Sequence, residues 1–213
     1  MPAAIAAPPH DCALCPRLAA FRAANRAANP GWFNAPVPSF GPMDARLLVV
    51  GMAPGLRGAN RTGRPFTGDH AGILLYSTLI RFGLASGAYA ADPADGLTLV
   101  GTRITNAVRC VPPANKLERG ELGTCNRFLV AELENLPKLK AILALGLHAH
   151  DAVLLAHKLR RSSLRFAHGA QHALPNGLFL VDSYHVSRLN TATGRLTTAM
   201  FESVVRQVSE AAG

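Results

Sequence analysis

The sequence predicts an α/β protein in which a central four-stranded parallel sheet lies between two helical layers, a three-layer α/β/α arrangement. Short apolar segments have the length of buried strands, and segments with helical spacing alternate with them. The composition, 49% hydrophobic and 16% charged, supplies a substantial core. Because 213 residues suit one domain, we expect a single domain over residues 12–213, preceded by a flexible arm at residues 1–11.

The predicted strands are runs of aliphatic or β-branched residues that end at a glycine or a polar residue. They cover residues 46–51, 99–108, 140–146 and 178–183. The predicted helices carry apolar residues at helical spacing and cover residues 12–29, 71–85, 121–136, 148–160 and 196–208. The expected order is therefore one leading helix followed by four strand–helix units, with no internal repeat and no domain linker.

The charge balance indicates a polyanionic partner. The chain has 22 Lys and Arg against 13 Asp and Glu, a formal net charge of +9, and 18 of the basic residues are arginines, whose planar fork suits phosphate. A compositional preference for arginine is the alternative. No apolar run approaches the ~18 residues that cross a bilayer, and the N-terminus lacks the basic start of a secretory signal. We therefore expect a cytoplasmic protein, and a monomer because no long apolar stripe is evident.

Four cysteines suggest a bound metal. Cys12 and Cys15 form a CxxC, and Cys110 and Cys125 are separated by fourteen residues. Disulfides are rare in a cytoplasmic chain, whereas four thiolates can hold zinc or an iron–sulfur cluster. A redox CxxC and unrelated buried thiols are the other interpretations, and the spacing does not distinguish iron from zinc. A metal here would connect the first helix to the segment after the second strand, a structural role.

The loop after the first strand favours close approach of its backbone to a ligand. Residues 51–69 hold five glycines and three arginines. The loop is not a P-loop, because no Gly-Lys-Ser/Thr follows, and it lacks the GxGxxG of dinucleotide sites. Loops of this length within compact domains are usually functional or disordered, and we favour function.

Polar residues follow the strand ends that parallel sheets gather at one edge. Asn106 ends the second strand with an amide that can donate and accept, as reading a base edge requires. His185 follows the last strand and opens an arginine-bearing loop, which favours a catalytic role over that of a core histidine. Trp32 and Phe33 are interpreted as loop anchors in the core. The pairs His148 with His150 and His168 with His172 lack a third ligand at metal spacing and are interpreted as structural.

Three motifs resemble the uracil-DNA glycosylase superfamily. They are GMAPGLRGANRTGRPFTGD from residue 51, TNAVRCVPPANK from residue 105 and YHVSRLNTATGRLT from residue 184. Together with the four cysteines they are most similar to family 5, the B-type enzymes with an iron–sulfur cluster. The resemblance extends from Cys12 to about Met200.

The resemblance implies a fold, a cofactor and an activity. It implies a four-stranded parallel sheet between helices, a [4Fe-4S] cluster on Cys12, Cys15, Cys110 and Cys125, and excision from DNA of uracil and of other deaminated bases such as hypoxanthine and xanthine. Family-4 relatives carry an acid where this chain has Met52, so the resemblance suggests Asp69 for water activation.

Cleavage of an N-glycosidic bond develops a sugar cation and an anionic base, and the candidate residues divide between the two charges. His185 is expected to donate to the base O2, Asn106 to engage the polar edge of the base, and Asp69 to orient water and favour the sugar cation. Gly51, Met52, Ala53 and Gly55 are expected to line the pocket, and Phe66 to stack on the base. The expected DNA contacts are Arg57, Asn60, Arg61, Arg64, Ser187, Arg188 and Arg195, with Arg188 or Leu189 entering the space left by the base.

Two other functions are compatible with parts of the pattern. A catalytically silent, metal-stapled DNA-binding module would use the same basic loops without chemistry, but Asp69 and His185 favour an enzyme. A zinc-stabilised hydrolase of the esterase type lacks its GxSxG motif. Formation of an abasic site on uracil-containing DNA separates the first interpretation from both.

Overall fold

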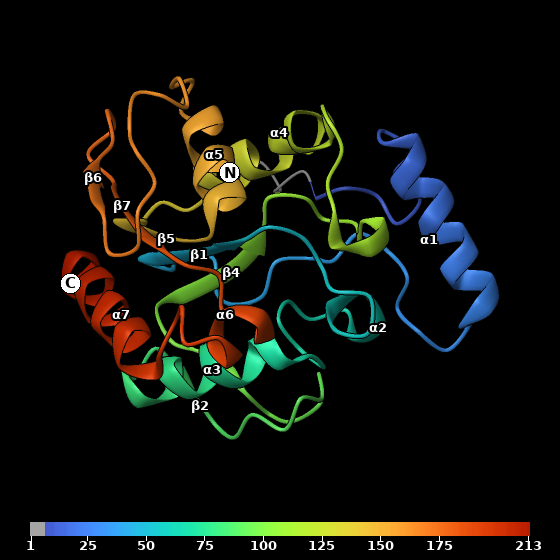
Figure 1. Cartoon of the computed structure of the whole chain (residues 1–213), viewed down its shortest axis with the longest axis horizontal. Coiled ribbons are helices and arrows are strands. Elements are labelled where there is room, and N and C mark those ends of the chain that lie inside the picture. Colours follow the sequence, from blue (N-terminus) through green and yellow to red (C-terminus); the bar gives the residue numbers. More distant parts are fainter. Residues whose placement is uncertain (1–6) are drawn as a thin grey trace.

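The computed structural model describes residues 7–213 and is an α/β domain with a five-stranded sheet. Its helices and strands are α1 (Pro16–Ala28), β1 (Leu47–Gly51), α2 (Ala59–Thr62), α3 (His70–Arg81), β2 (Ala85–Ser86), β3 (Thr98–Leu99), β4 (Thr102–Asn106), the 3-10 helix η1 (Pro113–Asn115), α4 (Glu121–Glu134), β5 (Ala141–Leu145), α5 (Leu147–Ala156), β6 (Gln171–Ala173), β7 (Phe179–Ser183), α6 (Arg188–Ala192) and α7 (Thr198–Ala212). Figure 1 shows the sheet between two groups of helices.

The sheet order is β4-β1-β5-β7-β6, and the first four strands are parallel as predicted. The fifth strand corrects the four-stranded expectation: β6 pairs antiparallel with β7 at the sheet edge. It is three residues long and largely exposed, so it carries no apolar pattern that a sequence could reveal.

The alternation of side chains along β1 divides the core into two halves. Leu47 and Val49 pack towards α3 and α7, whereas Leu48 and Val50 pack towards α4 and α5. All five β1 residues are buried, as expected for a central parallel strand covered on both faces. Figure 1 shows α4 and α5 on one side of the sheet and α3 and α7 on the other.

Several element ends differ from the predicted ones for identifiable reasons. The first helix begins at Pro16, because proline is favoured in the first turn, and this leaves Cys12 and Cys15 before the helix. Gly101, with φ +56°, interrupts the predicted second strand, so that β3 joins β2 in a separate small hairpin. Thr197 caps α7 by accepting a hydrogen bond from the Met200 amide.

Part of the predicted N-terminal arm lies outside the described residues, namely residues 1–6. Of the remainder, Asp11 accepts a hydrogen bond from Arg26 of α1, and the backbone carbonyl of His10 accepts another at 3.0 Å. In residues 7–213, no helix is both long enough and apolar enough to span a bilayer.

Candidate active site

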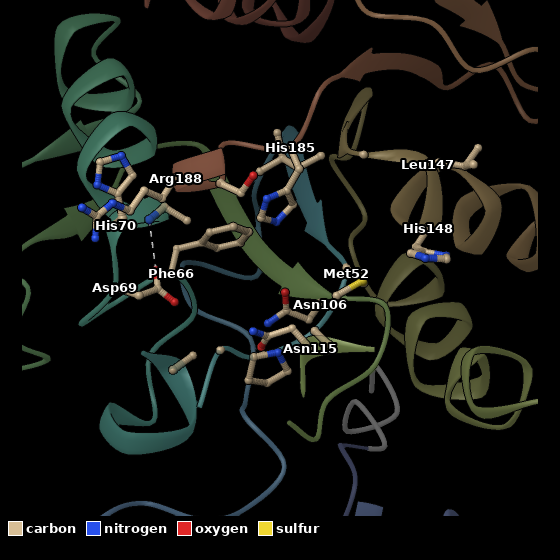
Figure 2. A pocket seen from close by; sticks show the side chains of 18 residues that line it. Met52, Phe66, Asp69, His70, Asn106, Asn115, Leu147, His148, His185 and Arg188 are labelled. Carbon is tan, nitrogen blue, oxygen red and sulfur yellow. Dashed lines mark hydrogen bonds between the residues drawn. The ribbon is translucent and has the colours of Figure 1, made fainter. Parts of the chain in front are cut away.

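The carboxyl ends of the parallel strands open into a cavity of about 430 Å³. Its walls come from the loop after β1, the end of β4, the end of η1, the start of α5 and the segment after β7. In Figure 2, Phe66, Asn106 and His185 converge on this cavity, with Asp69 and His70 to one side. The sequence thus predicted correctly that the Gly/Arg loop, Asn106 and His185 meet at one sheet edge.

His185 lies directly after β7, with its ring in the cavity wall. Burial lowers the pKa of His185 to about 4, so the imidazole is neutral at pH 7. The ring centroid lies 6.2 Å from that of Phe66. The side-chain amide of Asn190 donates to the His185 carbonyl at 2.8 Å and holds its backbone. The site therefore presents a neutral imidazole, on a backbone that Asn190 holds, in a largely apolar wall.

Asn106 ends β4 opposite Gly51 of β1 and is 3% exposed. A Cβ atom on Gly51 would lie 2.5 Å from Asn106 Oδ1 and 2.5 Å from Phe66 Cζ. Gly51 itself does not line the cavity, which corrects the expectation that it contacts the base. Its missing side chain instead lets Asn106 and Phe66 approach each other.

Phe66 occupies the cavity with a backbone φ of +53°, a value that side-chain-bearing residues rarely adopt. Two hydrogen bonds hold this conformation. The Tyr89 hydroxyl donates to the Phe66 carbonyl at 3.0 Å, and the Tyr76 hydroxyl donates to the Pro65 carbonyl at 2.6 Å. A Cβ atom on Gly72 would lie 1.9 Å from the Phe66 carbonyl oxygen, so α3 can pack here only with glycine.

Asp69 caps the N-terminus of α3, where its Oδ1 accepts a hydrogen bond from the Ala71 amide at 3.1 Å (Figure 2). Its Oδ2 faces Gly55 and Gly58, where a Cβ atom would come within 2.6 and 2.1 Å. Burial raises the pKa of Asp69 above its ordinary value of 3.8, against the backbone hydrogen bonds that lower it. A carboxylate with a raised pKa is a better proton acceptor for water.

The other predicted pocket residues Met52, Ala53 and Gly55 line the cavity as expected. Sequence reasoning did not single out Asn115, His70, Leu147 or His148 as pocket residues, although all four line it. Asn115 has φ +55° after a residue with φ +51°, and asparagine is enriched in that conformation. The adjacent prolines in VPPANK were the available signal for such a turn.

Ser187 and Arg188 lie at the cavity mouth. Ser187 caps α6 by accepting from the Asn190 amide, which leaves its hydroxyl hydrogen available to a phosphate. Arg188 and Arg195 are exposed, and the Arg195 guanidinium lies 4.6 Å from the centroid of the Tyr184 ring. These three residues are accessible to a DNA backbone.

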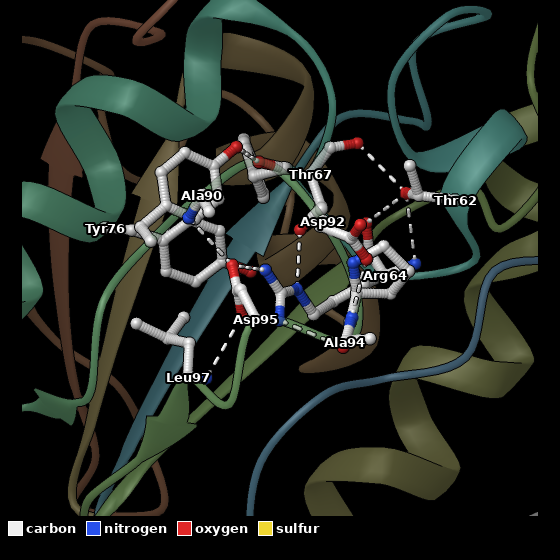
Figure 3. A network of polar contacts seen from close by, with 12 residues as sticks. Thr62, Arg64, Thr67, Tyr76, Ala90, Asp92, Ala94, Asp95 and Leu97 are labelled. Carbon is white, nitrogen blue, oxygen red and sulfur yellow. Dashed lines mark hydrogen bonds and ion pairs between the residues drawn. The ribbon is translucent and has the colours of Figure 1, made fainter.

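Of the four candidate DNA contacts in the first loop, Arg57 and Arg61 are exposed, whereas Asn60 and Arg64 are buried. The expectation of a DNA contact is therefore corrected for Asn60 and Arg64. The Asn60 amide donates to Asn34 Oδ1 at 2.9 Å. Arg64, 5% exposed, pairs in bidentate geometry with Asp95 at 2.7 Å for both bonds (Figure 3).

Arg64 and Asp95 clamp the segment that carries Phe66. The Arg64 guanidinium also contacts the rings of Phe40, Tyr76 and Tyr89. The hydrogen bonds from Arg64 hold the pKa of Asp95 well below its usual 3.8, despite partial burial. The clamp therefore fixes the loop in its left-handed turn, and its role is structural.

The four cysteines line a second, small cavity together with apolar residues. All are free thiols among the described residues, with Cys110 and Cys125 buried. Burial raises the pKa of Cys15, the second cysteine of the CxxC, which is opposite to what a redox CxxC requires. The donor set therefore fits a metal or cluster held by four sulfurs.

Arg22 of α1 supplies a second observation of fit. It is 4% exposed, and its Nη1 donates to Cys110 Sγ at 3.2 Å. Its Nε is buried with no partner among residues 7–213. An orphaned buried donor beside four thiols is what an additional sulfur acceptor would satisfy.

The fold also brings His150, His172 and Asp182 together, a set that sequence spacing did not show. His150 Nδ1 lies 2.9 Å from Asp182, and its Nε2 lies 3.0 Å from the Leu164 carbonyl. Burial opposes protonation, but these two acceptors raise the pKa of His150 above 6.5. Both ring nitrogens of His150 face acceptor oxygens, so neither is free for a metal, and the contact with Asp182 ties α5 to β7.

Comparison with known proteins gives concordant results. Residues 38–209 match the family model for the uracil DNA glycosylase superfamily. The chain is 48% identical to the type-5 uracil-DNA glycosylase of Thermus thermophilus, over 95% of this chain and 94% of that protein. It is 42% identical to that of Mycobacterium leprae, over 95% and 92%, and 38% identical to that of Pyrobaculum aerophilum, over 95% and 90%.

Proposed function

Because this chain belongs to the uracil DNA glycosylase superfamily, whose members excise uracil in base-excision repair, we propose that its main cavity receives a uracil flipped out of DNA and hydrolyses the N-glycosidic bond. One observation carries the proposal: Phe66 and Asp69 from the loop after β1, Asn106 from the end of β4 and His185 from the segment after β7 meet in one cavity. The product is an abasic site and a free base.

His185 stabilises the leaving base. As the bond breaks, negative charge develops on the base O2, and the neutral imidazole donates a hydrogen bond to it. Because the pKa of His185 is about 4, its imidazole is neutral at pH 7 and remains a neutral hydrogen-bond donor throughout the reaction. Burial makes this bond stronger than it would be in water.

Asn106 and Phe66 select and hold the base. The Asn106 amide offers a donor and an acceptor to its polar edge, and the Phe66 ring lies against its face. Asn115 lines the same cavity and adds a second amide. Few fixed polar groups face the base, so we extend the proposal to hypoxanthine and xanthine. Duplexes carrying one uracil, hypoxanthine or xanthine, treated with alkali after incubation, test this breadth through strand cleavage at the abasic site.

Asp69 acts at the sugar. The loop after β1 contains no acidic residue before Asp69. Met52, near the start of this loop, lines the cavity but offers no carboxylate. The Asp69 carboxylate orients water, accepts its proton and favours the cationic sugar.

We expect Asp69→Asn to lower the single-turnover rate on uracil-containing duplex by about 10²-fold. Asparagine is as good an N-cap as aspartate, so the helix start should survive while the proton acceptor is lost. Thermal melting of the variant should match the wild type. A rate within a few-fold of wild type, with an unaltered melting temperature, would remove Asp69 from the mechanism.

The DNA backbone is held by exposed residues around the cavity, namely Arg57, Arg61, Ser187, Arg188 and Arg195. Flipping costs a few kcal/mol, which phosphate contacts offset. Leu189, 72% exposed on α6, fills the space that the base leaves in the duplex.

We further propose that Cys12, Cys15, Cys110 and Cys125 hold a structural [4Fe-4S] cluster. The cluster would join the start of α1 to the segment after β4 and to α4, and it takes no part in the hydrolysis. Metal and sulfide analysis of the purified protein tests this. Iron and acid-labile sulfide in equal amounts indicate the cluster, whereas zinc indicates a tetrahedral metal ion on the same four thiolates.

For Cys15→Ala we expect loss of bound iron and a lower melting temperature. For Arg22→Met we expect iron to be lost to a chelator about tenfold faster, because a donor to a ligating sulfur is removed. Arg22→Lys, which keeps a charged donor, should lie between Arg22→Met and wild type. The role of Arg22 is wrong if Arg22→Met retains iron and its visible absorbance as long as wild type does.

A further inference from the structure

A third cavity of about 480 Å³ lies beside the proposed active site. We call it the flanking groove, and it is lined by Asn29, Trp32, Leu56, Arg57, Arg61 and Gly68. It is next to the main cavity along the chain at two points. Leu56 follows Gly55 and Gly68 precedes Asp69, and both Gly55 and Asp69 line the main cavity.

One wall of the groove is the loop after α1, which is attached to α2. The Phe33 amide donates to the Arg61 carbonyl, and the Asn34 amide donates to the Asn60 carbonyl, each at 3.0 Å. The buried Asn60 and Asn34 side chains add a further bond. Figure 1 shows α2 beside the chain that follows α1. These contacts fix Trp32 relative to the loop after β1.

The groove carries two cations that are free to bind an anion. Arg57 and Arg61 are exposed, and no carboxylate in residues 7–213 pairs with either. The Arg61 Nε donates to the Arg57 carbonyl at 3.0 Å, which orients its guanidinium. A Cβ atom on Gly68 would lie 2.9 Å from the Arg61 Nη2. The absence of a side chain at Gly68 therefore leaves room for the guanidinium.

Trp32 is not the core anchor that the sequence suggested. It is partly exposed in the groove, and its neighbour Phe33 is 38% exposed. No aromatic ring in the described part of the chain stacks on Trp32. An indole face beside two arginines is a combination that binds a phosphate and stacks a base.

We propose that the flanking groove binds the deoxynucleotide next to the flipped one in the same strand. Arg57 and Arg61 contact its phosphate, and Trp32 stacks on its base. This inference rests on the proposed function, because it is the nucleotide in the main cavity that brings its neighbour to the groove. The groove would thus hold the damaged strand at a second point and oppose its return to the stack.

Trp32 is the only tryptophan in the chain, so its fluorescence reports on the groove alone. We would titrate the intact protein with a duplex that carries a non-cleavable abasic analogue. The expected result is quenching of Trp32 and its protection from acrylamide. Trp32→Leu and Arg61→Gln should each weaken binding about tenfold, whereas Trp32→Phe, which can still stack, should retain most of the affinity. Arg46→Gln removes one charge from the opposite end of the sheet and should have little effect.

Unchanged fluorescence on saturation, or Trp32→Leu binding as tightly as wild type while folded by circular dichroism, overturns the proposal. An equal loss with Arg46→Gln and Arg61→Gln also overturns it, because the effect is then general charge. Failure of the glycosylase proposal looks different: the duplex binds and quenches Trp32, but uracil is never released.

Discussion

Replacement of His185 by alanine should lower the single-turnover rate on uracil-containing duplex by about 10²–10³-fold, the usual effect of losing one donor to a developing anion. The ring lies in the cavity wall, and under the proposed mechanism its loss leaves the base O2 without that donor. Affinity for an abasic-analogue duplex should change little, because the phosphate contacts remain. Rates under enzyme excess and binding by anisotropy separate the two effects.

The pH profile gives an independent check on the state of His185. Because burial lowers its pKa from 6.5 to about 4, the imidazole is neutral above pH 4 to 5 and gains a proton only below that. The wild-type rate should therefore show no His185 inflection between pH 8 and pH 5. A step in rate near pH 6.5 that disappears in the alanine variant would contradict a neutral donor, and near-normal turnover of that variant would remove the donor altogether.

Arg64→Met should lower the free energy of unfolding by about 3–5 kcal/mol, because it leaves the buried Asp95 carboxylate without its cation. The clamp also holds Phe66 in its left-handed turn, so the remaining folded protein should turn over more slowly. Urea unfolding measures the first effect, with Arg46→Met as the control, since a surface change of this kind is usually worth within about 0.5 kcal/mol.

The pH dependence of the Arg64 clamp has a definite sign. The folded-state pKa of Asp95 lies below its ordinary 3.8, so its contribution to stability is present above that value and is lost as the pH falls through the folded-state pKa. Wild type should therefore lose more stability than Arg64→Met on acidification from pH 5. Equal stability of the two proteins in urea at pH 7 would contradict the structural role of Arg64.

The four parallel strands could be predicted because each is a buried apolar run, and the helices between them because their apolar spacing is regular. β6 could not, since it is short and polar and exists only through pairing with β7. The β2–β3 hairpin was missed for a related reason: Gly101 interrupts an otherwise continuous β-branched run.

The gathering of Asn106 and His185 beside the Gly/Arg loop followed from parallel topology, because strand ends share an edge. Asp69, at the start of α3, was suggested by the family resemblance and not by the topology. Which arginines face DNA did not follow, since Arg57, Arg61 and Arg64 occur in the same Gly/Arg-rich loop. Only the fold reveals that Arg64 pairs with Asp95, thirty-one residues away, whereas Arg57 and Arg61 stay exposed. The position of Trp32 was predicted wrongly because hydrophobicity alone does not indicate which aromatic side chain faces a groove.

The most direct test of the central claim is detection of the released base. Purified protein would be incubated with a duplex containing one uracil, and free uracil and abasic DNA would be quantified by mass spectrometry. The account predicts both products in equal amounts from wild type. Salt-sensitive binding of the duplex with no released uracil would contradict it and would instead indicate a protein that binds DNA without chemistry.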